Sequence, residues 1–348
     1  MSSKVYFKSI ANNISKDAAL LQILKNIPDY RKDSFVAIKL TIGDEKSRLY
    51  LKPDLVKQVV EEVKRKGARP FIFDTNVIYQ GKRTNAVDHL NLAYEKGFSP
   101  ENVKAPFIIA DGAFGLDGRE FSVDYKHIKK IKAPSFIGII DNLVVLSHIT
   151  GHIMTGYAGA IKNVGMGMSS RSGKQVQHSS VKPNVISKKC VMCGACIAIC
   201  PVSAISDKND KAYIDSKVCI GCGECLCACR FDAVSVNWKT DIKMFGERMV
   251  EYTAGILSKF KNKFFINFAF DITKECDCIA VVDEPVICKD LGILASSDIL
   301  AVEKASLDLL VKDEDVFCKA QKSNLSLGQL SYAQTLSLGS LDYELLTL

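Results

Sequence analysis

Two cysteine-rich stretches, SKKCVMCGACIAICPVSAI (residues 187–205) and SKVCIGCGECLCACRFDAV (residues 216–234), lie near the middle of this 348-residue chain. In each stretch four cysteines follow the spacing C-x2-C-x2-C-x3-C, and the second copy begins 29 residues after the first. The residues after the last cysteine also match, since both copies reach an alanine followed by a branched apolar residue. The sequence therefore predicts an internal repeat that folds as a small pseudo-twofold module over residues 187–238.

The cysteine spacing predicts two 4Fe-4S clusters. Bacterial two-cluster ferredoxins use this run, in which three cysteines hold one cluster and the fourth binds the neighbouring cluster. The gap before the fourth cysteine fits one turn of a short helix, which carries its sulfur toward the other cluster. The stretch thus resembles the bacterial 2x(4Fe-4S) ferredoxin family. The expected ligands are Cys190, Cys193, Cys196 and Cys229 for the first cluster, and Cys219, Cys222, Cys225 and Cys200 for the second.

A pair of zinc sites is the main alternative for these cysteines, because zinc ribbons also contain C-x2-C. Zinc knuckles lack the third and fourth cysteines at this spacing. Eight cysteines in two registered copies therefore favour clusters over zinc.

The composition predicts a second, larger unit around the module. The chain is too long for a ferredoxin alone, and 47% of its residues are hydrophobic. It contains no apolar run long enough to span a membrane and no basic, apolar leader at the N-terminus. We therefore expect a cytoplasmic protein without membrane association, in an anaerobic host. In that reducing compartment its 13 cysteines are expected to bind metal instead of forming disulfides.

The flanks of the module alternate between predicted strands and predicted helices. This alternation predicts an α/β fold, a mostly parallel sheet with helices on both faces, into which a small α+β two-cluster module is inserted. The α/β domain would comprise residues 1–186 and 239–348. Strands are expected at 35–40, 70–74, 107–111, 136–140, 142–147 and 264–271, and helices at 53–66, 86–96, 241–259 and 298–312.

A candidate ligand site follows the predicted strand that ends near residue 147. Sites in open α/β sheets lie beyond the carboxyl ends of the strands. The glycine-dense stretch 151–167 can bring its backbone amides close to an anion, or it can allow close helix–sheet packing. Three of the five histidines lie around it. Their grouping makes a metal or proton-transfer role one interpretation, and separate hydrogen-bonded structural histidines are the other. The candidate catalytic residues are His148, His152, Lys162 and His178.

A second cysteine motif lies outside the repeat. Cys276 and Cys278 flank Asp277. A C-x-C pair can bind a soft metal or respond to redox conditions, and two uncoordinated thiols are the other interpretation. Cys276 and Cys278 are therefore a further candidate metal site, and an additional metal or anionic ligand of unknown identity is expected with the two clusters.

The distribution of basic residues indicates which partners the protein is expected to bind. The formal net charge is +7, with basic runs at 126–132 and 259–263. No aromatic interleaving or nucleic-acid-binding motif accompanies these runs, so we expect solvated surface and no nucleic-acid partner. Docking of an acidic redox partner protein is the other interpretation.

The flanks resemble the domain-of-unknown-function 362 family, in its members with a ferredoxin insertion. The resemblance spans nearly the whole chain, and it implies an α/β fold, iron–sulfur clusters and redox work in anaerobic prokaryotes, without a particular reaction. It rests on residues 151–152, 159–167, 170–174, 177–178, 276–278, 290–296 and 343–345.

The sequence as a whole predicts an iron–sulfur redox protein. Its two clusters would relay single electrons to or from a site in the α/β domain, as a redox enzyme or a reductive activator. A redox partner protein and a small-molecule substrate would follow from that role. The alternative is a ferredoxin-like electron carrier whose α/β domain only binds partners, and an iron–sulfur nucleic-acid or assembly protein is a more distant third. A carrier needs neither the histidines nor the glycine-dense loop, which favours the first interpretation.

Overall fold

The structure is a computed structural model. It describes the whole chain except residues 1, 12–13, 79–80, 153, 179–181, 220–222, 232, 236–241, 279–284 and 313–322.

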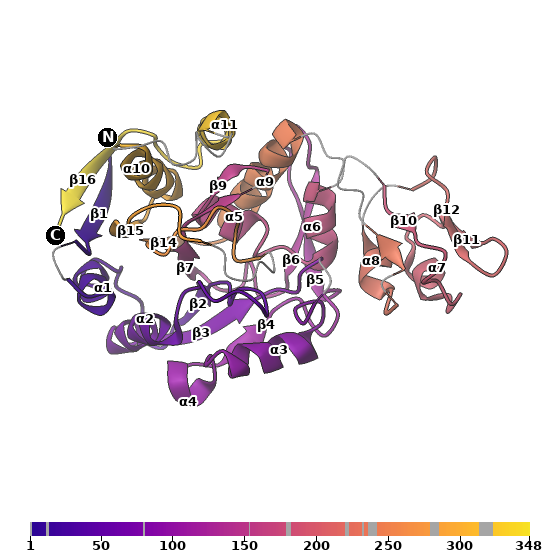
Figure 1. Ribbon diagram of the computed structural model, residues 1–348, viewed down its shortest axis with the longest axis horizontal. Helices are drawn as coiled ribbons and strands as arrows, with labels where there is room; N and C mark the ends of the chain where they lie inside the picture. The colour runs from indigo at the N-terminus through magenta and orange to yellow at the C-terminus, as the bar shows by residue number, and fades with distance from the viewer. Residues whose placement is uncertain are drawn as a thin grey trace.

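An eight-stranded sheet forms the centre of the molecule, in the order β16-β1-β15-β14-β7-β2-β3-β4 (Figure 1). Strand β15 runs antiparallel to both of its neighbours, and all the other strands of this sheet run in one direction. The predicted mostly parallel α/β sheet is therefore confirmed. The strands are β1 (Ser3–Ser9), β2 (Phe35–Lys39), β3 (Arg69–Asp74), β4 (Phe107–Ile109), β7 (Asn142–His148), β14 (Asn262–Ala269), β15 (Gly292–Ser296) and β16 (Tyr343–Thr347).

Helices cover both faces of this sheet, as Figure 1 shows. Because side chains alternate along a strand, Val36 and Ile38 of β2 enter one hydrophobic core and Ala37 enters the other. One face carries α1 (Lys16–Leu24), α2 (Pro53–Arg65), α3 (Ala86–Glu95) and α4 (Pro100–Val103), and the other carries α5 (Ala160–Gly165), α9 (Ile242–Leu257), α10 (Ile299–Val311) and α11 (Ser323–Thr335).

Local sequence signals explain where these helices begin. Pro53 occupies the first turn of α2, where no backbone N–H is needed, and the apolar residues that follow at helical spacing are buried. Asp298 caps α10 by accepting hydrogen bonds from Leu300 N (2.9 Å) and Ala301 N (3.0 Å). The sequence therefore predicts these helices to within a residue or two.

The cysteine-rich stretch forms a separate unit at one end of the molecule (Figure 1). Strands β7 and β14 lie side by side in the main sheet although this unit separates them in the sequence. The unit thus interrupts one α/β domain, and its first and last strands pair with each other. Its elements are β10 (Asn184–Val185), α7 (Ala195–Ile199), β11 (Ile205–Asp207), β12 (Ala212–Ile214), α8 (Glu224–Ala228) and β13 (Val234–Ser235).

The strand predicted at 136–140 is wrong. These residues form turns, with Gly138 in the left-handed region at φ +82°. The strand in this part of the chain is β6 (Lys130–Pro134), which pairs with β5 (Gly118–Ser122) outside the main sheet. Phe136 packs edge-on against Phe71 and Phe73 of β3, with ring centroids 5.5 and 4.9 Å apart. Phe136 therefore packs onto the main sheet without belonging to one of its strands.

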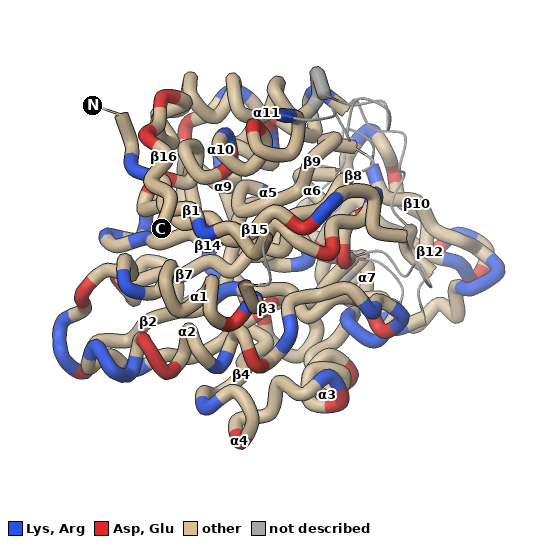
Figure 2. The backbone as a smooth tube through the Cα atoms, turned by 60° about the vertical axis from the view of Figure 1, so that its left-hand side comes forward, with Lys and Arg blue, Asp and Glu red and all other residues tan. Residues whose placement is uncertain are grey.

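Charged residues of both signs are interspersed over the helices and loops in the view of Figure 2. The basic run at 126–132 is part of this pattern, because its lysines have acidic partners. The pairs are Lys126 with Glu247, Lys129 with Asp124, Lys130 with Glu120, and Lys132 with Glu224. No helix within the described residues is long and apolar enough to cross a membrane.

A buried carboxylate anchors the start of α5. Glu303 of α10 accepts hydrogen bonds from Ala160 N (2.7 Å) and Ile161 N (3.4 Å), two amides of the first turn of α5. Gly159 precedes them, and a Cβ at this position would lie 2.2 Å from Glu303 Oε1. Glycine is needed here for close approach, since the carboxylate occupies the space of a side chain.

Replacing Gly159 with alanine is expected to lower the free energy of unfolding by about 1–3 kcal/mol, because the new methyl group overlaps the buried carboxylate. Urea denaturation monitored by circular dichroism measures this change. Gly246 of α9 is the matched control, since a Cβ there meets no atom within 4 Å. Gly246→Ala is expected to leave stability unchanged or raise it slightly. Equal losses in the two variants would contradict the packing argument.

Candidate functional site

A cavity of about 90 Å³ lies beyond the carboxyl ends of β2, β3 and β7, where sites in parallel sheets are expected. All four candidate residues line it: His148, His152, Lys162 and His178. Cys276 and Cys278 line it as well. The structure therefore brings together in one place the residues that the sequence singled out in three separate segments.

Four further charged residues line the cavity: Lys39, Asp74, Arg83 and Lys174. Of these, Lys39, Arg83 and Lys174 were not singled out as site residues from the sequence. Lys39 is fully buried, and its Nζ donates to Leu40 O (2.6 Å), Asp74 Oδ1 (3.0 Å) and Asn163 Oδ1 (2.9 Å). A lysine that closes an otherwise apolar strand, as in FVAIK, is the sequence signal that identifies it. Lys39 joins β2, β3 and α5 at the cavity wall.

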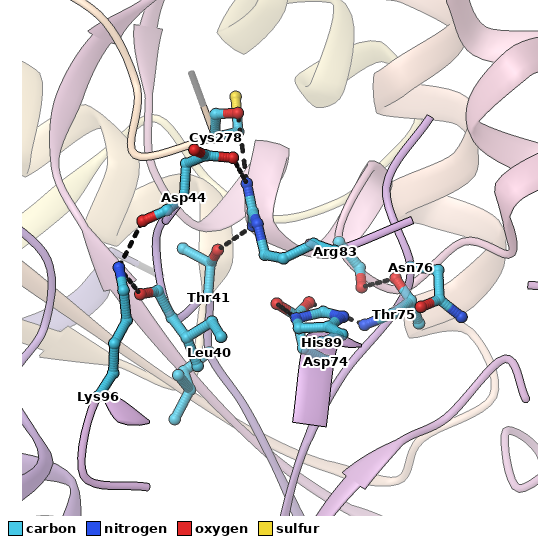
Figure 3. A network of polar contacts seen from close by, with 12 residues as sticks. Leu40, Thr41, Asp44, Asp74, Thr75, Asn76, Arg83, His89, Lys96 and Cys278 are labelled. Atoms are coloured by element: carbon cyan, nitrogen blue, oxygen red, sulfur yellow. Dashed lines mark hydrogen bonds and ion pairs between the residues drawn. The ribbon is translucent and has the colours of Figure 1, made fainter. Parts of the chain in front are cut away.

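Asp74 is the acidic partner of Lys39. Burial favours its neutral form, but the positive charges of Lys39 and Arg83 and a contact with His89 hold the pKa of Asp74 below its usual value. His89 Nε2 lies 3.6 Å from Asp74 Oδ2 (Figure 3). Asp74 is therefore ionised and serves as the counter-ion of the lysine.

Arg83 connects the loop after β3 to the C-x-C segment (Figure 3). It is only 2% exposed. Its guanidinium donates to Thr41 Oγ1 and Cys278 O, each at 3.3 Å, and lies 3.8 Å from Asp44 Oδ2. Among the described residues its Nε atom has no hydrogen-bond partner. One donor of this buried cation is therefore not satisfied by the described residues.

His148 forms an ion pair with the residue between the two cysteines. Its Nδ1 lies 3.0 Å from both carboxylate oxygens of Asp277, and its Nε2 lies 2.8 Å from Phe270 O. Burial lowers the pKa of His148, but the negative charge of Asp277 outweighs burial and the pKa is raised. Both ring nitrogens are thus taken up by protein acceptors, and His148 positions the Cys276–Cys278 segment rather than ligating a metal.

His152 and His178 form an aromatic wall with Phe245. Thr155 N donates to His152 Nδ1 (3.1 Å), which places the proton of the neutral ring on Nε2. Burial, with Lys162 and Lys174 nearby, lowers the pKa of His178 to about 3. The two rings lie 6.2 and 4.8 Å from the Phe245 ring. His178 is therefore uncharged at neutral pH.

Lys162 reaches the C-x-C pair from α5. Its Nζ lies 3.2 Å from Cys278 Sγ, and burial lowers the pKa of Lys162 to about 7 although Asp277 opposes this. Cys276 and Cys278 are joined by a disulfide, so the expectation that the cysteines form no disulfides is wrong for this pair. In this oxidised state the pair offers no thiolates, so the candidate metal site at Cys276 and Cys278 is not available to a metal.

Lys174 occupies the wall on the side of the cysteine-rich unit. It belongs to α6 (Arg171–His178), and its Nζ donates to Thr75 Oγ1 and Ser169 O. Burial lowers the pKa of Lys174 to about 8. Behind it, burial raises the pKa of Asp111 to about 6. Lys174 therefore remains largely charged at neutral pH.

The lining carries more positive than negative charge. Lys39, Arg83, Lys162 and Lys174 are basic, whereas Asp74 and Asp277 are the acidic residues of the described lining. The amides at the start of α5 are already bound to Glu303, so the glycine-dense loop serves close packing rather than anion binding. The arrangement suits an anionic ligand held by side chains.

The cysteines of the repeat surround a second, partly open cavity. Its lining includes Cys190, Cys193 and Cys196 from the first copy and Cys229 from the second. These are the four residues expected to share one cluster. For the other set, the structure describes Cys219, Cys225 and Cys200, while Cys222 lies outside the described residues.

The two copies share their local geometry. Gly194 and Gly223 begin α7 and α8 with the same left-handed φ of +77°, and the two helices pack together. Backbone amides donate to sulfur at matching positions in the two copies, four residues after the last cysteine of each, and one further amide donates to Cys190. The amide–sulfur contacts are Ala204 N to Cys200 Sγ (3.2 Å), Ala233 N to Cys229 Sγ (3.2 Å) and Ala212 N to Cys190 Sγ (3.4 Å).

Within the described residues, no three His, Cys, Asp or Glu side chains converge on a point where one metal ion would sit. A cubane cluster places different demands on its ligands, because each of its four irons takes its own thiolate. The sulfurs of a cluster site therefore surround a space instead of meeting at a point. The chemistry of the donors and their placement around one cavity fit this group.

The cysteine-rich unit and the charged cavity are neighbours. Helix α6 contacts α8 on the cysteine side, and a Cβ on Gly223 would lie 2.5 Å from the Cβ of Gln175. The same helix supplies Lys174 and His178 to the cavity. Ile78 lines the cavity and also packs in the hydrophobic cluster of the cysteine unit. One short helix and one loop therefore separate the two sites.

Replacing Asp277 with asparagine is expected to lower the free energy of unfolding by about 3 kcal/mol near pH 6, because the buried His148 cation loses its partner. The raised native pKa of His148 makes the pair fully stabilising below about pH 6.5 and progressively less so as the pH rises through the native pKa. The difference between wild type and variant should therefore shrink toward pH 9, as urea denaturation at several pH values measures.

Asp141→Asn is the control for this measurement, since Asp141 forms an exposed pair with Lys261 and should contribute less than about 1 kcal/mol at any pH. A pH-independent cost of Asp277→Asn would show that His148 is not charged in the native protein.

Comparison with known proteins gives distant likenesses and one family. No curated protein matches the chain. The lactate racemase apoprotein from Thermoanaerobacterium thermosaccharolyticum is similar in structure, with a TM-score of 0.46 and 12% identity over 88% of this chain and 57% of that one. A structural-genomics protein from Thermotoga maritima is similar with a TM-score of 0.43 and 11% identity over 92% of this chain and 59% of that one.

The chain spans less than three fifths of the length of either structure, and neither likeness is close enough to transfer a function. The sequence also matches a family described as domain of unknown function (DUF362) over residues 36–308, which includes most of the α/β domain and the cysteine-rich unit. The chain therefore belongs to the DUF362 family.

Proposed function

We propose that this protein is an iron–sulfur redox protein that exchanges single electrons between two 4Fe-4S clusters and chemistry in the charged cavity. The first cluster would be held by Cys190, Cys193, Cys196 and Cys229, and the second by Cys219, Cys222, Cys225 and Cys200. Bound clusters of this type supply or accept one electron at a time. The cysteine-rich unit would then be a ferredoxin-type module.

The observation that carries this proposal is the grouping of thiols around the second cavity. Cys229 comes from the second copy of the motif, yet it lines the same cavity as Cys190, Cys193 and Cys196. A zinc site would instead bring four ligands to one point, and the described residues contain no point at which three such side chains converge. The exchange of the fourth cysteine is the property that the two-cluster pattern demands.

The protein environment of the sulfurs supports the same proposal. Backbone amides donate to Cys190, Cys200 and Cys229 at 3.2–3.4 Å. Such donors stabilise a negatively charged sulfur, and hydrogen bonds to the sulfurs tune cluster potentials. These amides would therefore stabilise the thiolate form in which a cysteine binds a cluster.

The charged cavity favours a redox enzyme or reductive activator over a simple carrier. Burying the charges of these four residues, Lys39, Asp74, Arg83 and Lys174, costs free energy. A domain that only binds a partner protein at its surface does not need buried charges. Clusters of buried ionisable groups with shifted pKa values are typical of functional sites. The excess of basic residues makes a small anionic molecule the expected substrate class, and an external one-electron donor protein the expected partner.

The exchanged-ligand arrangement predicts the iron content of cysteine variants. Anaerobically purified protein should contain about eight iron and about eight sulfide per chain. Each double variant removes two of the expected ligands. Cys193→Ser/Cys229→Ser affects one cluster and should retain about four iron, whereas Cys200→Ser/Cys229→Ser affects both and should retain almost none. Colorimetric iron and sulfide assays, with electron paramagnetic resonance of the reduced samples, measure the difference.

Cys288→Ser is the matched control, because this thiol lies outside the repeat and should leave the iron content unchanged. Equal iron in the two double variants would show that the fourth cysteines are not exchanged. One or two zinc ions without sulfide would overturn the cluster assignment altogether.

A further inference from the structure

The disulfide between Cys276 and Cys278 is presented to the charged cavity by a rigid support. Asp44 N donates to Asp277 O (2.8 Å), and Gly151 N donates to Thr273 O (2.8 Å). A Cβ on Gly151 would lie 2.1 Å from Lys274 O, so this strand lies directly against the segment. Arg83 holds the backbone of the C-x-C turn at Cys278, and His148 holds the side chain of its middle residue, Asp277. The fold therefore holds both sulfurs at a set position in the cavity wall.

Lys162 faces one sulfur of this pair. Three other cations near the cavity contact carboxylates: Lys39 contacts Asp74, Arg83 contacts Asp44, and His148 contacts Asp277. Lys174 donates to Thr75 Oγ1 and Ser169 O. Among the described residues, the hydrogen-bond partner of Lys162 Nζ is Cys278 Sγ at 3.2 Å. A disulfide sulfur is a poor acceptor, whereas a thiolate at the same place is a strong one. The geometry thus favours the reduced pair more than the oxidised one.

We propose that Cys276 and Cys278 form a redox-active pair, a disulfide that is reduced to a dithiol inside the cavity with Lys162 as the partner of the Cys278 thiolate. The proposal rests on the proposed function for the source of its electrons, a low-potential one-electron donor acting through the cysteine module. Nothing in it requires a metal at Cys276 and Cys278.

The half-reaction consumes two electrons and two protons. The S–S bond breaks, and one electron goes to each sulfur. One proton binds Cys276 Sγ to give a thiol, and the second binds Lys162, whose ammonium group then pairs with the Cys278 thiolate. Lys162 is ready to take this proton, because burial lowers its pKa to about 7 in the oxidised protein, in the presence of Asp277, Arg83 and Lys39.

The two cysteines differ in exposure, which divides their roles. Cys276 is 4% exposed, whereas Cys278 is partly exposed and is the sulfur that Lys162 contacts. Cys278 is therefore the reacting sulfur and Cys276 the one that re-forms the disulfide. The two proposed clusters each deliver one electron, and together they would supply the two electrons that the disulfide takes up.

Anaerobic thiol trapping tests the redox state. The protein is treated with dithionite, or left oxidised, and then denatured in iodoacetamide and digested for mass spectrometry. The peptide that contains residues 276–278 should carry no label when oxidised and label on both cysteines after reduction. Cys288 should be labelled in both samples. Label on both cysteines in every sample, or in none, would overturn the proposal.

Lys162 variants test the role of the lysine. In reduced native protein, Lys162→Met should slow alkylation of Cys278 at pH 7 by about tenfold or more and move the pH midpoint of alkylation upward, because the thiolate loses its cation. Lys162→Arg retains the charge and should restore most of the rate. A purely structural lysine would leave the pH midpoint unchanged in both variants, and that result would remove Lys162 from the proposal.

A cluster-deficient variant separates this inference from the proposed function. In Cys200→Ser/Cys229→Ser, a phosphine reductant should still convert the oxidised pair to labelled thiols, because it needs no cluster. Reduction by dithionite, the one-electron donor of the trapping experiment, should fail in that variant. If both reductants work equally well there, the pair is redox-active but does not depend on the cysteine module. If neither reductant labels the pair in the wild type either, the redox pair itself is refuted.

Discussion

The ion pair between Lys39 and Asp74 is the constraint on which the rest of the site depends. Both side chains are buried at the carboxyl ends of neighbouring strands, with Nζ and Oδ1 3.0 Å apart. An isolated charge in this position would be strongly unfavourable, so each residue requires the other. Lys39 also binds Asn163 of α5. The pair thereby sets the distance between the sheet and the glycine-dense segment that closes the cavity.

Close packing of that segment follows from the same constraint. A Cβ on Gly167 would lie 2.7 Å from Lys39 Nζ, and one on Gly165 would lie 2.6 Å from Met249 O. The glycines thus allow α5 to approach the buried lysine and helix α9. Their role is steric, and the internal carboxylate of Glu303 satisfies the amides at the start of α5.

The cavity and the cysteine module lie next to each other, and the proposed function depends on this placement. Helix α6 contacts the module on one side and supplies Lys174 and His178 to the cavity on the other. The α/β domain therefore places a charged cavity beside the proposed source of electrons. Glu224 of α8 also pairs with Lys132 of β6, which adds a polar contact to this junction.

Local patterns in the sequence determined the class of the fold and the metal ligands proposed for the repeat. Strand and helix periodicity, Pro53, and the cap residue Asp298 act within a few positions, so these elements can be predicted without knowledge of the fold. The repeated cysteine spacing is local in the same sense. The segment at 136–140 was misassigned because its apolar run forms turns outside any strand, where Phe136 packs against Phe71 and Phe73 of β3 and Ile139 is 71% exposed.

Only the tertiary structure decided which charges share the cavity. Lys39, Asp74, Arg83 and Lys174 come from different segments of the chain. The pKa shifts of Lys39, Asp74 and Lys174 arise from burial and from partners that only the folded sheet brings near. The same holds for the contact between Lys162 and Cys278, which are 116 residues apart. Electrostatic interactions depend on distance in space and on exclusion of water, and neither quantity is encoded in the spacing of residues along the chain.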